Sequence, residues 1–289
     1  MTPILEIQKL SHIYSPDTPF EHAALSNVDL TISRGEFVGL IGHTGSGKST
    51  LVQHMNGLLK PTSGHVLFDG RDIWEDPKFT RQIRFRVGLV FQYPEYQLFE
   101  ETVAKDVAFG PKNLGLSQEE IDSRVKEAVT MVGLDYDQIK DRSPFELSGG
   151  QKRRVAIAGV IAMGPEVLIL DEPTAGLDPK AHKDILSMIE EVHRLTGNIT
   201  ILVSHNMADV ARLSDKILVI DSGHLVVCGT PKEVFSQTEE LEKVGLDLPP
   251  ITRLTEELRK RGMKIEPTIL SIDEAAGQIA EYLKARGNG

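Results

Sequence analysis

Short apolar runs alternate with helical patterns along most of the chain. The apolar runs occur at 37–41, 167–170, 200–203 and 217–220. Their length and apolar character are typical of strands buried inside a sheet. Helical patterns separate them, and one begins at Ser117 and Glu120, which are spaced as a capping box. Strands that alternate with helices form a largely parallel sheet covered by helices, so the sequence predicts an α/β fold.

Both ends of the chain depart from this alternation. Near the start, residues 4–7 and 28–32 alternate between apolar and polar, which predicts strands of an antiparallel edge layer. Toward the end, Pro249-Pro250 separates two helical stretches, and Ser271 with Glu274 predicts the cap of a last helix. The expected apolar face of that helix is Ile272, Ala275, Ala276, Ile279 and Leu283. We therefore predict a main domain over residues 1–235 and a small helical module over residues 236–289.

Composition and charge narrow the class of protein. The 289 residues are 40% hydrophobic and 26% charged, as in an ordinary globular protein. The longest apolar stretch, Val155 to Met163, is far shorter than the roughly 20 residues of a membrane span. The first residues lack a signal-peptide pattern and Cys228 is the single cysteine, which together predict a cytosolic location. A net charge of −10 argues against nucleic acid as a partner.

A complete phosphate-binding loop follows the first apolar run. It lies between the predicted strand at 37–41 and a helical pattern over 48–58. Its glycines allow a tight curl in which backbone N–H groups and the helix N-terminus point at one anion. We expect Lys48 to reach the outer phosphates of a nucleotide and the Ser49 hydroxyl to hold Mg²⁺. The predicted nucleotide ligands in this phosphate loop are Gly42, Thr44, Gly45, Ser46, Gly47, Lys48, Ser49 and Thr50.

Two carboxylates follow the apolar run at 167–170. Asp171 and Glu172 therefore stand at the carboxyl end of a predicted strand, where open α/β sheets bind their ligands. We expect Asp171 to hold the magnesium ion through water. Glu172 is then free to orient and deprotonate an attacking water, so we predict that it is the general base.

A third motif, Leu147-Ser148-Gly149-Gly150-Gln151, precedes these carboxylates. Together the three motifs make residues 5–235 similar to the ATP-binding-cassette (ABC) family. The resemblance implies a P-loop NTPase fold of ABC type, with a parallel-sheet core, an antiparallel β edge layer and a helical subdomain at about 93–165. It also implies that Ser148, Gly149, Gly150 and Gln151 clamp the γ-phosphate of ATP bound to the opposite subunit. Ser148 is a good N-cap and the glycines expose backbone donors, which agrees with this role.

Further site residues follow from the family resemblance by their positions. Gln92 matches the glutamine that senses magnesium and the lytic water, and His205 matches the histidine that contacts the γ-phosphate. Asp178 matches the loop that crosses the dimer interface. Tyr14 falls where the family places an aromatic ring under adenine. The implied catalytic set is Glu172, His205, Gln92 and Lys48, and the implied magnesium ligands are Ser49, Gln92 and Asp171.

A narrower resemblance begins at Phe91 and Gln92. The run from Phe91 to Phe99 and residues 102–115 resemble the ATPases of energy-coupling-factor (ECF) transporters. Residues 42–45 and 53–62 resemble the second, A-prime, ATPase subunit of that family. The resemblance implies an ATP hydrolase that powers import of vitamins or trace metal ions at the cytoplasmic face of the cell membrane. Its implied partners are a second ABC ATPase, a membrane scaffold (T) subunit and a substrate-binding membrane (S) subunit, and the C-terminal module is implied to contact the dimer partner.

We expect Tyr93–Asp106, here called the coupling segment, to contact the scaffold. Its carboxylates surround two apolar side chains, Leu98 and Phe99, and the scaffold helices of the family present an arginine. An arginine–carboxylate contact beside an apolar groove fixes orientation as well as affinity. Replacement of Leu98 or Glu95 is expected to weaken this contact; the other carboxylates are Glu100, Glu101 and Asp106. The alternative is a loop that Leu98 and Phe99 pin to its own domain.

Other functions share these motifs. A dedicated cobalt or nickel importer, or another ABC transporter, is hard to separate by the ATPase sequence. A DNA-repair or chromosome-organising ATPase needs a long coiled-coil insertion, for which residues 92–147 leave no room. A nucleotide-gated scaffold usually lacks the catalytic glutamate or histidine, and this chain has both. The substrate stays open, because another subunit selects it. The choice between homodimer and heterodimer also stays open.

Overall fold

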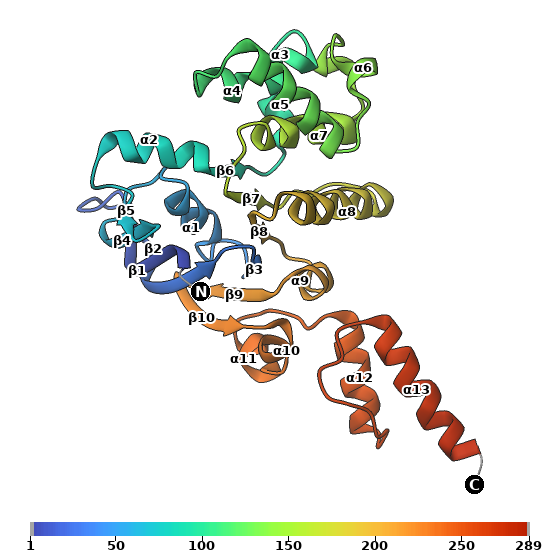
Figure 1. Ribbon diagram of the computed structural model, residues 1–289. Helices are drawn as coiled ribbons and strands as arrows, with labels where there is room; N and C mark the ends of the chain where they lie inside the picture. Colours follow the sequence, from blue (N-terminus) through green and yellow to red (C-terminus); the bar gives the residue numbers. More distant parts are fainter. Residues whose placement is uncertain (1–2, 288–289) are drawn as a thin grey trace.

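The computed structural model describes residues 3–287, so the outermost limits of both predicted domains, residues 1–2 and 288–289, lie outside the described residues. Two β-sheets occupy the middle of the molecule (Figure 1). Helices from the centre of the sequence cover one end, and helices from the end of the sequence form a separate lobe at the other. This arrangement agrees with the predicted α/β class.

A six-stranded sheet forms the centre of the fold. Its strands are β3 (Phe37–Ile41), β6 (Val87–Val90), β7 (Val167–Asp171), β8 (Ile199–Val203), β9 (Lys216–Asp221) and β10 (His224–Gly229). They lie in the order β10-β9-β3-β8-β7-β6, and all pairs are parallel except β10 with β9. Every residue of β3, β6, β7 and β8 is buried, as expected for parallel strands covered on both faces.

A four-stranded antiparallel sheet packs beside it and confirms the predicted edge layer. Its strands are β1 (Pro3–Tyr14), β2 (His22–Ser33), β4 (Ser63–Phe68) and β5 (Arg71–Asp72), in the order β2-β1-β4-β5. The first two strands are longer than the predicted runs at 4–7 and 28–32. Register shifts within the strands interrupt the alternation of polar and apolar residues, so the sequence pattern ends before the strand does. Leu5, Ile32 and Phe68 share one apolar cluster with Val38 and Val203 of the central sheet.

Four helices connect strands of the two sheets, and a fifth, α10, follows the last strand. They are α1 (Lys48–Met55), α2 (Pro77–Arg86), α8 (Pro179–Thr196), α9 (Met207–Leu213) and α10 (Pro231–Phe235). The predicted helix after the phosphate loop begins at Lys48 as expected and ends at Met55. Helix α8 ends at Gly197, whose left-handed backbone (φ 61°) is a common helix stop.

A helical layer covers one edge of the central sheet. It comprises η1 (Pro94–Gln97), α3 (Val103–Val107), α4 (Phe109–Asn113), α5 (Gln118–Met131), α6 (Tyr136–Ile139), η2 (Pro144–Glu146) and α7 (Gly149–Ile161). The capping box of Ser117 and Glu120 is present at the start of α5. Val125 and Val155 share an apolar cluster with Leu168 and Leu170 of β7, so this layer is packed directly on the sheet.

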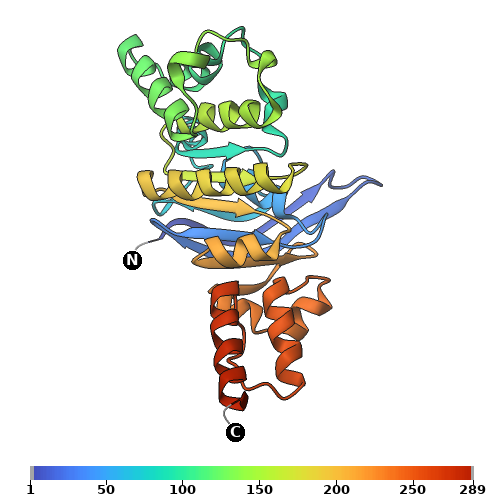
Figure 2. The same ribbon diagram turned by 90° about the vertical axis from the view of Figure 1, so that its right-hand side faces the viewer.

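The C-terminal lobe contains α11 (Thr238–Lys243), α12 (Pro250–Lys260) and α13 (Ile272–Gly287) (Figure 2). Ser271 Oγ accepts a hydrogen bond from the Glu274 N–H at 3.1 Å, which confirms the predicted cap. Most of the apolar face predicted for α13 is not buried. Only Ala275 is buried, whereas Ile272 and Leu283 are 73% and 57% exposed, because α13 packs chiefly against α12.

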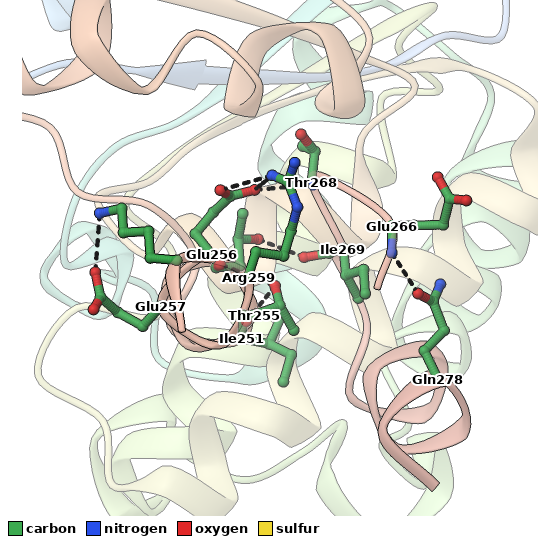
Figure 3. Close-up of polar contacts among 11 residues, drawn as sticks. Ile251, Thr255, Glu256, Glu257, Arg259, Glu266, Thr268, Ile269 and Gln278 are labelled. Atoms are coloured by element: carbon green, nitrogen blue, oxygen red, sulfur yellow. Dashed lines mark hydrogen bonds and ion pairs between the residues drawn. The ribbon is translucent and has the colours of Figure 1, made fainter. Parts of the chain in front are cut away.

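Polar contacts hold the loop between α12 and α13 (Figure 3). The Glu266 N–H donates to Gln278 Oε1 at 2.7 Å, and the Thr268 N–H reaches Glu256 Oε1 at 3.5 Å. Ile269 accepts a bond from Thr252 Oγ1 at 2.6 Å. The loop is therefore fastened to both helices.

The predicted boundary at residue 235 stays a prediction. Beyond it, Leu241, Leu246 and Leu248 pack into one apolar cluster with Val219 and Phe235 of the main domain. Within residues 3–287, no helix is both long enough and apolar enough to cross a membrane.

Candidate active site

The phosphate loop connects β3 to α1. Gly47 is the N-cap of α1 with φ 109°, and no side chain caps the helix. A Cβ added there would lie 2.6 Å from the Ala24 carbonyl oxygen, so only glycine fits. Gly45 also has positive φ (82°), but a Cβ there would meet no atom within 4 Å. This empty space beside free helix-terminal donors fits a bound phosphate.

Lys48 lies across the loop. Its Nζ donates to the carbonyl oxygens of Gly42 and His43 at 2.7 and 2.8 Å. Burial lowers the pKa of Lys48, while the nearby carboxylates of Glu172 and Asp171 partly restore it. The structure thus holds a cation where the backbone donors of the loop converge.

Ser49 and Asp171 meet at the carboxyl end of β7. The Ser49 hydroxyl donates to Asp171 Oδ2 at 2.9 Å. Burial raises the pKa of Asp171, against the opposing effects of Ser49 and Lys48. A carboxylate and a hydroxyl are oxygen donors of the kind that Mg²⁺ prefers. Among the described residues no group of three or more His, Cys, Asp or Glu side chains could hold a metal ion.

Glu172 has an unusual backbone conformation for a residue with a side chain. Its φ is 50°, and its N–H donates to the Val203 carbonyl at 3.0 Å, which fixes the residue between β7 and β8. His205 Nδ1 lies 2.8 Å from Glu172 Oε2, so the two predicted catalytic residues form a pair. Burial raises the pKa of Glu172, and His205 opposes that rise. Backbone strain and a raised carboxyl pKa are both common at catalytic positions.

The raised pKa of Glu172 has a consequence for stability. A folded-state pKa above the unfolded value of about 4.3 means that the ionised carboxylate destabilises the folded protein above that raised pKa. The penalty disappears as the pH falls below the unfolded value. We therefore expect ligand-free Glu172→Gln to be more stable than the parent by about 0.5–2 kcal/mol at neutral pH.

Urea unfolding at neutral pH and near pH 4 measures this effect. The gain should shrink at the lower pH, because Glu172 of the parent is then protonated in the folded state and largely protonated in the unfolded state. Glu190→Gln is the matched control, since Glu190 lies on the surface of α8 paired with Arg212. An equal gain at both pH values would contradict the electrostatic explanation.

Three other predicted residues lie around this centre. The Tyr14 hydroxyl lies 3.2 Å from Thr50 Oγ1, which ties the end of β1 to the phosphate loop. Gln92 is exposed just beyond the end of β6. Asp178 caps α8, and its Oδ1 accepts bonds from the N–H groups of Lys180 and Ala181 at 3.0 Å each. The structure therefore brings Tyr14 to the loop and gives Asp178 a local structural role as well.

The segment Leu147–Gln151 begins α7 in the helical layer. Ser148 and Gln151 form a capping box, and Cβ atoms added at Gly149 or Gly150 would meet nothing within 4 Å. Helix α7 packs on η1, α3, α5 and β6, whereas α1 packs on β2 and β6. In Figure 1 the two helices lie in different layers. One chain therefore does not bring this segment onto its own phosphate loop.

The coupling segment differs from our expectation in two residues. Leu98 is 6% exposed and belongs to the apolar cluster of the helical layer, so it is not a surface anchor. Glu95 pairs with Arg153 at 2.6 Å inside the molecule and is not available to a partner. The exposed apolar side chains are instead Tyr93 (41%), Tyr96 (84%) and Phe99 (57%), of which the last two are the most exposed. Asp106 is also structural, because its Oδ2 accepts the N–H groups of residues 99 and 100 at 2.9 Å each.

Sequence reasoning missed two polar contacts beside the site. His43, inside the phosphate loop, places Nε2 2.8 Å from Asp221 Oδ1 at the end of β9. Arg153 contacts both Glu95 and the backbone that follows Glu172. Nothing local in the sequence marks these pairs, because their members are far apart along the chain.

Comparison with known proteins agrees with this geometry. Residues 25–175 match the sequence profile of the family described as ABC transporter. A Clostridium perfringens protein named energy-coupling factor transporter ATP-binding protein EcfA2 is 56% identical over 280 residues, covering 97% of this chain and 98% of its own length. The protein of the same name from Caldanaerobacter subterraneus subsp. tengcongensis is 56% identical over 284 residues, covering 98% and 99%.

Solved structures show the same architecture. The structure of cbiO1 from Clostridium perfringens, described as part of the ABC transporter complex cbiONQ, has a TM-score of 0.75 and 41% identity. It covers 89% of this chain and 100% of its own. The dimeric ATP-binding cassette MJ0796, bound to ADP and Pi, has a TM-score of 0.69 and 29% identity, covering 78% and 98%. The chain therefore belongs to the ABC transporter family and, within it, to the energy-coupling factor transporter ATP-binding proteins of the EcfA2 type.

Proposed function

We propose that the chain binds ATP with Mg²⁺ and hydrolyses it to power an ECF importer for vitamins or trace metal ions. The observation that carries this proposal is the joint geometry of the phosphate loop, the Ser49–Asp171 contact and the Glu172–His205 pair. The high identity to proteins named as ECF transporter ATP-binding proteins supports the same function. A dedicated cobalt or nickel importer, or another ABC transporter, is the alternative, and the likeness to cbiO1, described as part of an ABC transporter complex, fits each of these transporters.

The nucleotide would lie on the phosphate loop, with its adenine against Tyr14. Backbone N–H groups at the start of α1 and the Lys48 ammonium would bind the phosphates. Ser49 and Asp171 would hold Mg²⁺, with Gln92 as a further ligand from the end of β6. When bound, the ion would neutralise charge that develops on the transferred phosphoryl group.

Glu172 would orient the attacking water and accept its proton. The raised pKa of its carboxyl moves it toward the operating pH, where a general base works best. His205 holds the carboxylate from one side and presents an exposed ring toward solvent. We assign it the contact to the γ-phosphate.

A second ATPase would complete the site. The segment Leu147–Gln151 stands apart from the chain's own phosphate loop, and its glycines face open space. An ABC cassette with the same fold has been solved as a dimer with ADP and Pi. We propose that Ser148 and its glycines close on ATP bound to the partner, and that Asp178 lies at the same interface.

The membrane partners would be a scaffold subunit and a substrate-binding subunit, which would place the chain at the cytoplasmic face of the cell membrane. We keep the coupling segment as the scaffold contact but assign its anchors to Tyr96 and Phe99. Phe99 stacks edge-on against Phe109 with ring centroids 5.0 Å apart, and Asp106 fixes its backbone. Exposed aromatic side chains such as Tyr96 and Phe99, held on a fixed backbone, are typical of interface hot spots.

Replacing Tyr96 by aspartate tests this surface. We expect recovery of the scaffold in detergent pull-downs to fall about 30-fold, as for loss of a hot spot of about 2 kcal/mol. ATP hydrolysis by the free protein should survive. Phe20→Asp is the matched control, because Phe20 is also aromatic and also 84% exposed but lies in the β1–β2 loop. Normal assembly of Tyr96→Asp together with Phe99→Asp would exclude this surface.

The function itself is tested by purifying the chain with its membrane partners and reconstituting the complex in vesicles. ATP-dependent uptake of a vitamin supports the proposal. Uptake of Co²⁺ or Ni²⁺ in place of vitamins supports the alternative. Hydrolysis without uptake by an intact complex would contradict both.

A further inference from the structure

Arg153 is a charged residue in the interior of the protein. It lies on α7, one turn beyond the cap at Ser148, and only 2% of it is exposed. All three nitrogens of its guanidinium donate hydrogen bonds. Nε and one terminal nitrogen donate to the two carboxylate oxygens of Glu95 at 2.9 and 2.6 Å. The other terminal nitrogen donates to the carbonyl oxygens of Pro173 and Ala175 at 3.0 and 2.9 Å.

These bonds join three parts of the molecule that the proposed function uses. Glu95 belongs to η1 in the coupling segment. Pro173 and Ala175 belong to the turn 172–178, here called the catalytic turn, which begins at Glu172 and ends at Asp178. Helix α7 carries the clamp on the partner's nucleotide. A single side chain therefore connects the catalytic centre, the dimer interface and the surface assigned to the membrane scaffold.

Tyr93 adds a second contact between the same parts. Its ring lies 6.0 Å from the Arg153 guanidinium, and a Cβ at Gly176 would lie 3.6 Å from its Cε1 atom. Tyr93 begins η1 with a left-handed backbone (φ 56°), which is uncommon for an aromatic residue. Like Glu172 on the other side of the contact, it is held in a strained conformation by its surroundings.

Stability alone does not explain an arginine at this place. A buried ion pair is often no more stabilising than apolar side chains of the same volume, and the surrounding helical layer is apolar. A planar guanidinium with fixed donors does what an apolar side chain cannot, because it sets distance and orientation between its partners. Burial acts to raise the pKa of Glu95, but the bonds and charge of Arg153 outweigh it and hold the pKa below its usual value. The pair is therefore ionised at neutral pH.

We propose that Arg153 is a positioning residue that transmits movement of the catalytic turn to η1, and so couples nucleotide state to the scaffold surface. The inference rests on the proposed function for its biological meaning. The proposed movement from the catalytic turn through Arg153 to η1 takes place within this chain alone. When the γ-phosphate binds or leaves, a shift of Pro173 and Ala175 moves the guanidinium, and the two bonds to Glu95 carry η1 with it.

A fluorescent probe on η1 tests the transmission without any transport. The probe is attached to Tyr96→Cys in a Cys228→Ser background, and its response to Mg²⁺ with a non-hydrolysable ATP analogue is measured. We expect Glu95→Gln and Arg153→Lys to reduce the amplitude of this response by about 2- to 30-fold, the range for residues that carry coupling. The affinity for the analogue should change much less. The double variant should lose no more than either single one, because both act through one contact.

Two matched controls separate coupling from general damage. Arg154→Lys alters the neighbouring arginine of α7, which bonds to the carbonyl of Val132 and not to Glu95. Glu101→Gln alters another carboxylate of the coupling segment, which pairs with Lys105 on the surface. Both should keep the full response. Arg153→Met serves as a packing control, since it fills the space without the directed bonds and should lose the response even where the fold is stable.

The reconstituted transporter gives the second readout. We expect uptake per ATP hydrolysed to fall about 2- to 30-fold in Glu95→Gln and Arg153→Lys. A normal probe response in both variants, with at most a lower melting temperature, would overturn the inference and leave Arg153 a structural residue. If the parent complex transports nothing, the proposed function fails, yet a probe response that depends on Arg153 still supports the transmission.

Discussion

Glu172→Gln is expected to lower ATP turnover by about 10²-fold or more while ATP binding is retained. The amide keeps the shape of the side chain and a contact to His205, but it cannot accept a proton from water. With hydrolysis blocked, the dimer should remain closed around ATP. The large effect follows from the position of Glu172, which the backbone and His205 fix at the end of β7.

Phosphate release in the presence of Mg²⁺ measures turnover, and size-exclusion chromatography with ATP measures the trapped dimer. Glu190→Gln again provides the control, because it removes a surface carboxylate of the same type. Near-normal hydrolysis by Glu172→Gln would remove this residue from the mechanism. Loss of ATP binding would instead indicate damage to the phosphate loop.

Mixed dimers are expected to recover activity that both parent variants lack. Lys48→Ala disables the phosphate loop, and Ser148→Arg blocks the clamp that closes on the partner's nucleotide. Each homodimer then carries two defective sites, and we expect a loss of at least about 10²-fold in turnover. In a mixed homodimer of this chain, both defects fall in one composite site. The other site is intact and should hydrolyse ATP.

Two affinity tags allow the mixed dimer to be isolated before its turnover is measured. A dimer of two Lys48→Ala chains with different tags is the control for exchange and handling. If isolated mixed dimers are as inactive as their parents, each chain uses its own clamp or the two sites must act together. Where the chain pairs only with a paralogue, one substitution is made in this chain and the other at the matching position of the paralogue.

The parts of the site that depend on local sequence could be predicted well. The strand at 37–41 and the helix start at Lys48 follow from an apolar run and a glycine-rich loop, which determine backbone conformation within a few residues. The caps at Ser117 and Ser148 have the same local origin. Asp171 and Glu172 were placed correctly at a strand end because a buried strand must stop where charges begin.

Contacts between distant segments could not be predicted. Glu95 appeared to be a free surface carboxylate, and only the fold brings it to Arg153, 58 residues away. Leu98 appeared to be a surface anchor, but an apolar residue between acidic ones has the same sequence pattern whether it faces a partner or its own core. The burial of the apolar face of α13 could not be predicted either. Its spacing is helical, yet the lobe has too few neighbouring elements to cover Ile272 and Leu283.

One apolar cluster limits where the chain can be truncated. It joins Leu241, Leu246 and Leu248 to Val219 and Phe235 of the main domain. A chain cut after Phe235 would leave apolar side chains of the main domain facing water, and each buried leucine it lost would remove about 1.5–3 kcal/mol of burial energy. Such a fragment should aggregate. A cut between Leu248 and α12 leaves the three leucines in place. Shortened versions, fusions and protease sites therefore belong at Pro249, where α12 and α13 can be removed with the three leucines left in place and only the partly buried Leu270 lost from the edge of the cluster.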